Sequence, residues 1–219
     1  MAYILNIETA TKNCSVSIAK DGKTLVCREI AEQGYSHAEK LHLFIEEALK
    51  DLNLNFSDLD AIAVSQGPGS YTGLRIGVSA AKGLCYALNI PLIAVDTLEV
   101  LALKLSISEG LLIPMIDARR MEVYSAIFDS KGQKIRNTEA QIIDENSFQD
   151  IDQKINLIGD GAMKFKDILT SDKFIFHPEI IYPSAKEMSA LSFEKHKISD
   201  TVDVAYFEPF YLKDFMISK

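Results

Sequence analysis

The glycine-rich stretch from Gln66 to Gly77, QGPGSYTGLRIG, constrains the fold of this chain more than any other segment. It follows an apolar run, 59–65, that is typical of a buried strand, and it leads into a helical pattern over 72–88. A strand, a glycine-rich turn and a helix start place free backbone N–H groups at the positive end of a helix, which favours anion binding. The GK[ST] signature of a P-loop is missing, so the stretch predicts an α/β protein with a different kind of anion-binding turn.

The segments around this turn follow a recognisable order. Before it, the pattern predicts three strands, with an Asp21-Gly22 hairpin turn between the last two, and an amphipathic helix. After the helix that the turn begins, one more strand and one more helix complete the first half of the chain. In chain order these strands and helices are expected over 3–7, 16–19, 24–30, 38–52, 59–65, 72–88, 92–95 and 97–106. A three-stranded meander followed by αβαβα is the ribonuclease-H-like order, in which helices cover both faces of a mixed sheet.

The second half repeats this order in a reduced form. The segments 113–117 and 123–128 and the Lys131-Gly132 turn retrace the first hairpin, and 157–161 repeats the step from strand to glycine to helix. Its first helix is reduced to a weak pattern at 147–151. The duplication predicts the two-lobed α/β fold of actin and Hsp70 (ASKHA), with a first lobe at 1–106 and a reduced second lobe at 107–219. The final segment is expected either in the second lobe or packed back on the first.

Charge and composition exclude several classes of function. The net charge of −8 opposes nucleic-acid binding by the chain alone, because such binding depends on Lys and Arg contacts with phosphate. A local basic patch of Lys12, Arg119 and Arg120 is the alternative to scattered, solvated charge. Three cysteines without a CxxC pattern predict neither a disulfide framework nor a zinc site. The amino terminus has no signal-like region and no apolar run spans a bilayer, so we expect a cytoplasmic protein.

Two carboxylates, Glu8 and Asp117, each end a predicted strand where this architecture holds a metal and nucleotide phosphates. Mg²⁺ prefers such oxygen ligands. The loops that follow contain no glycine, so their Cβ atoms would crowd a phosphate, and carboxylates bonded to their own loops are the alternative. Weak binding of ATP or ADP with Mg²⁺, rather than a tightly bound cofactor, is the most that this pattern predicts. The candidate residues of this cleft are Glu8, Thr9, Gly67, Gly69, Asp117, Gly159 and Gly161.

The helix after the glycine-rich turn carries a face without bulk, formed by Gly73, Gly77, Ala80 and Ala81. Small residues let another backbone approach closely, either the chain's own sheet or a helix of a partner. His37 and His42 do not share a helix face, and the chain has neither a Gly-x-Ser-x-Gly elbow nor a catalytic Cys–His setting. No metal site and no catalytic residue are predicted.

With these residues in place, the chain resembles the TsaB family, also called YeaZ, the small partner in bacterial tRNA threonylcarbamoyladenosine synthesis. GPGSYTGLRIG and DARxxEVY are the most specific motifs of the resemblance. The resembling segments are 4–19, 67–101, 117–124 and 208–213.

The resemblance implies a non-catalytic subunit. The family is a shortened relative of the catalytic subunit TsaD, whose two metal-binding histidines align with Thr97 and Leu101 of this chain. It implies a heterodimer with TsaD, joined by the ATPase TsaE, that transfers threonylcarbamoyl to adenosine 37 of tRNAs reading ANN codons. The resemblance implies that the chain contacts tRNA only within this complex, and that it forms a homodimer when TsaD is absent. The expected partner surface lies on the helices 37–52 and 72–88, with His37, Leu41, Gly73, Leu74, Gly77, Ala80 and Ala81.

Two other functions remain open from the sequence. A stand-alone nucleotide-binding ATPase or phosphotransferase that uses Glu8 and Asp117 is favoured only by the architecture, which does not by itself imply function. A glycoprotein peptidase, an older label of the same family, is the weaker alternative, because the chain offers no nucleophile, metal pair or base for it.

Overall fold

The structure is a computed structural model, and it describes residues 1–31 and 37–212. Lys213, the last residue of the carboxyl-terminal resemblance, lies outside the described residues. The chain forms two compact units: residues 1–100 with the chain from Ser184 onward, and residues 101–183.

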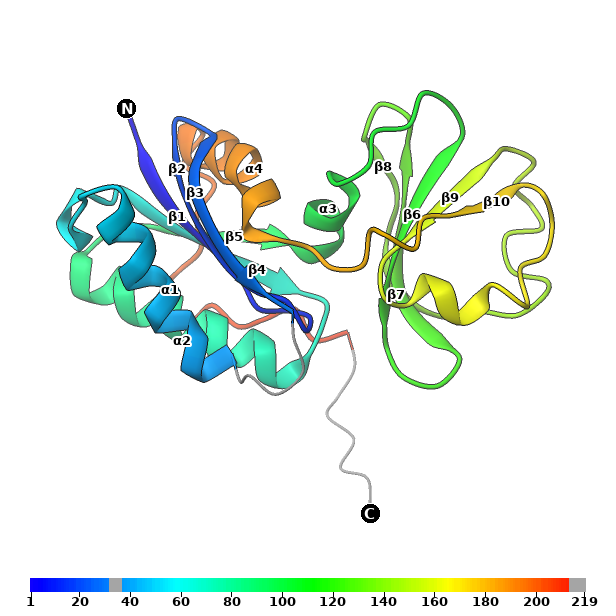
Figure 1. Cartoon of the computed structure of the whole chain (residues 1–219), viewed down its shortest axis with the longest axis horizontal. Coiled ribbons are helices and arrows are strands. Elements are labelled where there is room, and N and C mark those ends of the chain that lie inside the picture. Colours follow the sequence, from blue (N-terminus) through cyan, green and yellow to red (C-terminus); the bar gives the residue numbers. More distant parts are fainter. Residues whose placement is uncertain (32–36, 213–219) are drawn as a thin grey trace, which may run out of the picture. The chain divides into compact units, whose positions relative to one another are not determined.

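The first unit is built on a five-stranded mixed sheet with the order β3-β2-β1-β4-β5 (Figure 1). The central strand β1 is antiparallel to β2 and parallel to β4, as the ribonuclease-H-like order predicts. β4 also pairs in parallel with β5, and β2 forms a hairpin with β3. These strands are β1 (Tyr3–Glu8), β2 (Cys14–Lys20), β3 (Lys23–Ile30), β4 (Ala61–Gly67) and β5 (Leu92–Asp96).

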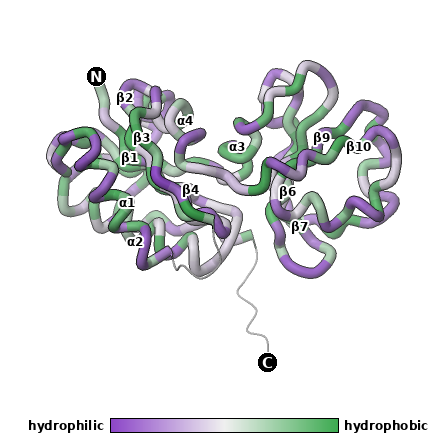
Figure 2. The backbone as a smooth tube through the Cα atoms, in the orientation of Figure 1, coloured by the Kyte–Doolittle hydropathy of each residue, from purple (hydrophilic) through white to green (hydrophobic). Residues whose placement is uncertain are grey.

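Helices cover both faces of this sheet. On one face α1 (His37–Asp51) and α2 (Tyr71–Leu88) pack on Leu5 and Ile7, and Figure 2 shows that hydrophobic and hydrophilic residues alternate along both helices. On the other face α4 (Ala185–Lys197) packs on Ile4. Successive side chains of a strand point to opposite faces, so β1 supplies both cores. A short 3-10 helix, η1 (Phe56–Asp58), precedes β4.

The second unit repeats the sheet order as β10-β9-β6-β7-β8, with β6 in the place of β1. Its strands are β6 (Leu111–Asp117), β7 (Glu122–Asp129), β8 (Lys134–Ile142), β9 (Ile155–Ile158) and β10 (Phe174–Phe176). The duplicated two-lobed fold with a reduced second lobe is confirmed. Residues 103–183, all of them described, contain no α-helix, only the 3-10 helix η2 (Ala162–Phe165). The predicted helix at 147–151 is wrong: 145–150 is a series of turns, around a left-handed Phe148 that is buried in the core.

The division between the units differs from the boundary expected after residue 106. It falls within α3 (Thr97–Ala102), between Val100 and Leu101, because Val100 packs in the core beneath α4. The chain from Ser184 onward belongs to the first unit. Beyond α4, Val202 forms a β-bridge with Leu92 at the edge strand β5.

Candidate functional site

The loop between β1 and β2 packs directly on the bare face of α2. A Cβ atom on Gly69 would overlap the carbonyl oxygen of Ala10, and one on Gly73 would overlap that of Thr9. A Cβ on Gly77 would overlap the Thr9 hydroxyl, which donates a hydrogen bond of 2.8 Å to the Gly73 carbonyl. These three glycines therefore permit a close approach within the chain itself.

This packing fills the place where the sequence predicts an anion site. Ser70, the first residue before α2, donates its N–H to the Ala10 carbonyl at 2.6 Å, and its side chain caps the helix by accepting from Gly73 N at 3.3 Å. The Thr9 and Ala10 carbonyls, which are negative ends of dipoles, thus lie where a phosphate would approach. The predicted residues Thr9 and Gly69 both take part in this packing: Gly69 lies against the Ala10 carbonyl, and Thr9 lies against Gly73 and Gly77.

Glu8 is the most unusual ionisable group of the first unit. It is fully buried at the end of β1, and its Oε1 accepts from Ala10 N at 2.6 Å. Its Oε2 has no hydrogen-bond partner within the described chain. Burial raises the pKa of Glu8 to about 7, although the Ser65 side chain and the Ala10 amide oppose the rise. The carboxyl is therefore partly protonated near neutral pH.

A tightly bound Mg²⁺ does not fit this donor set. Glu8 offers one free oxygen, whereas Mg²⁺ takes octahedral oxygen ligands and keeps several waters, which a fully buried carboxyl does not accommodate. Across residues 1–31 and 37–212 there is no group of three or more His, Cys, Asp or Glu side chains placed to hold a metal.

The other strand-end carboxylate, Asp117, belongs to the second unit and is already paired. Lys164 contacts it at 2.6 Å, and its backbone N–H donates to Asp160 Oδ1 at 3.0 Å. Gly159 has a φ of +101°, and a Cβ there would overlap the Met115 carbonyl; a Cβ on Gly161 would lie 2.7 Å from Val123 Cγ1. Both glycines thus allow the segment after β9 to pack closely on β6 and β7.

The partner residues expected on the two helices lie mostly inside the first unit. His37 is half-buried and bonds through Nε2 to the Thr11 carbonyl at 2.8 Å. Ala80 is half-buried. The buried members are Leu41, Gly73, Leu74, Gly77 and Ala81. Two members of the small-residue face, Gly73 and Gly77, therefore contact the chain's own β1 and β1–β2 loop, as in the first of the two alternatives that the sequence leaves open.

A different face of α2 is exposed, and sequence reasoning missed it. It consists of Thr72, Arg75, Ser79, Gly83, Tyr86 and Ala87. Gly83 has open space where a Cβ would stand, and Tyr86 is 85% exposed. The recurrence of these residues every three to four positions was the available signal. The sequence alone does not show that this face is exposed, because both faces of α2 contain glycine.

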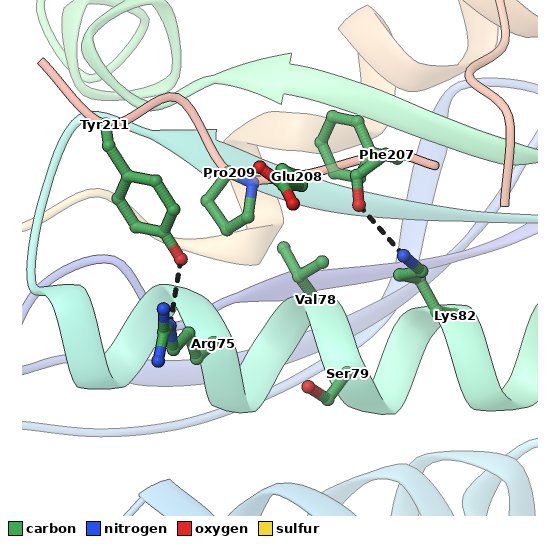
Figure 3. A pocket seen from close by; sticks show the side chains of 8 residues that line it. All are labelled: Arg75, Val78, Ser79, Lys82, Phe207, Glu208, Pro209 and Tyr211. Atoms are coloured by element: carbon green, nitrogen blue, oxygen red, sulfur yellow. Dashed lines mark hydrogen bonds between the residues drawn. The ribbon is translucent and has the colours of Figure 1, made fainter. Parts of the chain in front are cut away.

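The carboxyl-terminal segment is tied to α2 by two cations (Figure 3). Lys82 donates to the carbonyls of Ala205 and Phe207 at 3.1 and 2.9 Å. Arg75 donates to the Tyr211 hydroxyl at 3.1 Å, and its guanidinium lies 4.0 Å from the centre of the Tyr71 ring. A pocket of about 270 Å³ lies between them, but its cations are engaged by the chain itself, so it serves to anchor this segment.

The turn between β6 and β7 has an uncommon backbone. Arg119 and Arg120 both have positive φ values, 70° and 52°. Glycine and asparagine adopt left-handed backbone most readily, and for other residues this conformation costs about 1–2 kcal/mol per residue. Lys12, which the sequence grouped with these arginines, belongs to the other unit.

Comparisons with known proteins agree with this architecture. The family model for TsaD, tRNA N6-adenosine threonylcarbamoyltransferase, matches residues 27–214. The tRNA threonylcarbamoyladenosine biosynthesis protein TsaB of Bacillus subtilis is 30% identical over 96% of this chain and 93% of that protein. The chain belongs to the TsaB family. The TsaB protein of Escherichia coli is 29% identical over 96% of this chain and 94% of its own length.

The chain is also similar to a longer enzyme and to a solved structure. The tRNA N6-adenosine threonylcarbamoyltransferase of Bacillus subtilis is 40% identical over 108 residues, which span 42% of this chain and 31% of that enzyme. YeaZ from Pseudomonas aeruginosa shares the fold, with a TM-score of 0.84 and 24% identity over 97% of this chain and all of that one. The family takes part in the biosynthesis of threonylcarbamoyladenosine in tRNA. No helix in the described parts of the chain has the length and apolar character needed to cross a membrane.

Proposed function

We propose that this chain is the non-catalytic partner subunit of a tRNA threonylcarbamoyltransferase. In this role it holds TsaD in an active form, together with TsaE, while TsaD transfers threonylcarbamoyl to adenosine 37 of tRNAs that read ANN codons. The chain meets tRNA only within that complex, and it binds no nucleotide tightly.

The observation that carries this proposal is the filled turn before α2. A subunit that cradled phosphate there would leave the first N–H groups of α2 open to the ligand. In this chain Ser70 N donates to the Ala10 carbonyl, and the Thr9 carbonyl lies against Gly73. A phosphate at this turn would have to displace the Thr9 and Ala10 carbonyls, which favours a supporting role over phosphoryl transfer.

The corner between β5 and α3 supports the same role. Thr97, which the family resemblance places at a metal-binding histidine of TsaD, is buried, and its hydroxyl lies 2.6 Å from Ser65 Oγ and accepts from Gly67 N at 3.1 Å. Leu101, which the resemblance places at the second histidine, is buried as well. A hydroxyl is a weak metal ligand and leucine is none, so these positions support packing rather than metal chemistry.

The exposed face of α2 is the surface that we assign to TsaD. Ser79, Gly83 and Ala87 are small and exposed, which lets a partner helix approach closely, and Tyr86 beside them has the character of an interface anchor. The neighbouring helix α1 extends this surface with Leu43, which is 43% exposed. When TsaD is absent, the same face pairs with a second copy of the chain.

A reconstitution tests the proposed function. The purified chain alone, TsaD alone and both together, each with TsaE, ATP, a source of threonylcarbamoyl adenylate and tRNA, are assayed for modified adenosine 37 and for ATP hydrolysis. We expect modification only when both are present, at a rate at least about a hundredfold above either alone, which corresponds to about 2.7 kcal/mol.

A further arm, with the purified chain and neither TsaD nor the ATPase TsaE, tests for a stand-alone ATPase. Hydrolysis of ATP with Mg²⁺ by this chain alone, lost on Glu8→Ala, would contradict the proposed role. A fold control for that variant is the circular-dichroism spectrum of the purified protein, because Glu8 is buried and its loss also affects packing.

A further inference from the structure

The β6–β7 turn presents two arginines on a fixed backbone. Ala118 N donates to the Glu122 carbonyl at 3.1 Å, and Glu122 N donates to the Arg119 carbonyl at 3.3 Å. Arg119 N also donates to Asp117 Oδ1 at 2.7 Å. The tip of the hairpin is therefore held in one conformation before any ligand arrives.

Folding alone does not favour arginine at these positions. Arg119 and Arg120 are both left-handed, a conformation that glycine and asparagine adopt more readily than arginine. Backbone that is unfavourable for its residue types tends to occur at functional positions. The left-handed backbone at Arg119 and Arg120 is therefore energetically unfavourable, and the turn exposes two long cationic side chains.

The two guanidinium groups are unpaired within the described chain. Both arginines are exposed, and neither side chain has an ion pair or a hydrogen bond with a described residue. Two acidic residues flank the turn, Asp117 before it and Glu122 after it, and Asp117 is paired with Lys164 at 2.6 Å. The chain has a net charge of −8, so this turn, with its two exposed arginines, is a local positive site on an acidic protein.

We propose that Arg119 and Arg120 bind phosphodiester groups of the tRNA when the chain is assembled with TsaD. This inference rests on the proposed function. Guanidinium groups match phosphate oxygens with paired hydrogen bonds, and a pre-formed tip binds them without first ordering its backbone. The rest of the acidic chain repels the polyanion, so a contact with tRNA has to be local, and this turn provides one.

An acidic protein surface is the alternative ligand for Arg119 and Arg120. Met121 and Ile142 lie beside the turn and are 43% and 70% exposed, and apolar side chains next to arginine are common in protein interfaces. The experiment below distinguishes this occupant from tRNA, because a protein contact affects assembly and a phosphate contact affects the salt dependence of tRNA binding.

The test uses the double variant Arg119→Asn/Arg120→Gly, which gives the turn its preferred residue types while it removes both charges. The matched control is Lys131→Ala, which removes an exposed cation from the hairpin turn at the other end of β7. Each full-length chain is assembled with TsaD, and size exclusion measures the complex. Binding of an unmodified transcript of an ANN-reading tRNA is then measured by fluorescence anisotropy from about 50 to about 200 mM salt.

We expect the double variant to assemble normally and to bind the transcript roughly tenfold more weakly at the lowest salt, with a salt slope flatter by about 2. The Lys131→Ala complex is expected to match the wild type. A wild-type salt slope in the double variant would overturn the proposal, and so would failure to assemble with TsaD, which would identify a protein occupant. If the wild-type complex binds tRNA but does not modify it, the proposed function fails while this contact stands.

Discussion

Replacing Gly73 with alanine is expected to lower the free energy of unfolding of the first unit by about 3 kcal/mol, a large fraction of a typical domain's stability. The new Cβ would overlap the Thr9 carbonyl oxygen, which is backbone and cannot rotate away. Either α2 or the β1–β2 loop has to move, and both lie against the core that β1 shares with α1. Urea denaturation followed by circular dichroism measures the change.

Gly83→Ala is the matched control on the same helix. Nothing lies within 4 Å of a Cβ at that position, so the substitution adds helix propensity without a clash. We expect it to raise the free energy of unfolding by about 1 kcal/mol. The two variants should therefore differ by about 4 kcal/mol. Equal effects at Gly73 and Gly83 would contradict the assignment of inner and outer faces to α2.

The second large effect is a pH dependence that comes from Glu8. Its pKa is raised from 4.5 to about 7 by burial, so between these values the folded state binds a proton that the unfolded state has released. The contribution of Glu8 to stability is then complete below about pH 4.5 and is lost as the pH rises through about 7. The loss amounts to about 3 kcal/mol for a shift of this size.

The variant Glu8→Gln has no proton to lose and tests this directly. We expect the unfolding free energy of the wild type to fall relative to that of the variant between pH 4.5 and pH 8, and the two curves to run parallel above that range. Other titrating groups are common to both proteins and cancel in the difference. Parallel curves over the whole range would show that Glu8 titrates normally and is not desolvated as the structure has it.

The sequence predicted the sheets better than the surfaces. Alternating apolar residues and the Asp21-Gly22 turn determine strands locally, and α1, which connects β3 to β4, allows β4 to return parallel to β1, so the order of the first sheet could be predicted. The edge strand β10 of the second sheet was not predicted. The second unit lost its helices through short turns such as 145–150, where local hydrogen bonds of Asp144 and Ser147 compete with a helix.

The candidate site depended on contacts that no local pattern contains. Gly73, Gly77 and Gly83 are all glycines of one helix, and periodicity alone does not say which of them a distant loop covers. The absence of glycine from the segment after Glu8 did suggest that it forms no phosphate cradle. That its carbonyls would instead lie against the start of α2 required the tertiary structure.

The most direct test of the partner role is the assembly of Gly83→Arg with TsaD. Gly83 is exposed on α2 and faces open space, so a long charged side chain should leave the fold of the isolated chain unchanged while it blocks close approach of a partner helix. We expect the thermal unfolding of Gly83→Arg to match that of the wild type, Gly83→Ala to retain the complex, and Gly83→Arg to bind TsaD at least about a hundredfold more weakly by titration calorimetry, with tRNA modification reduced in parallel. Wild-type affinity and activity in Gly83→Arg would contradict the account.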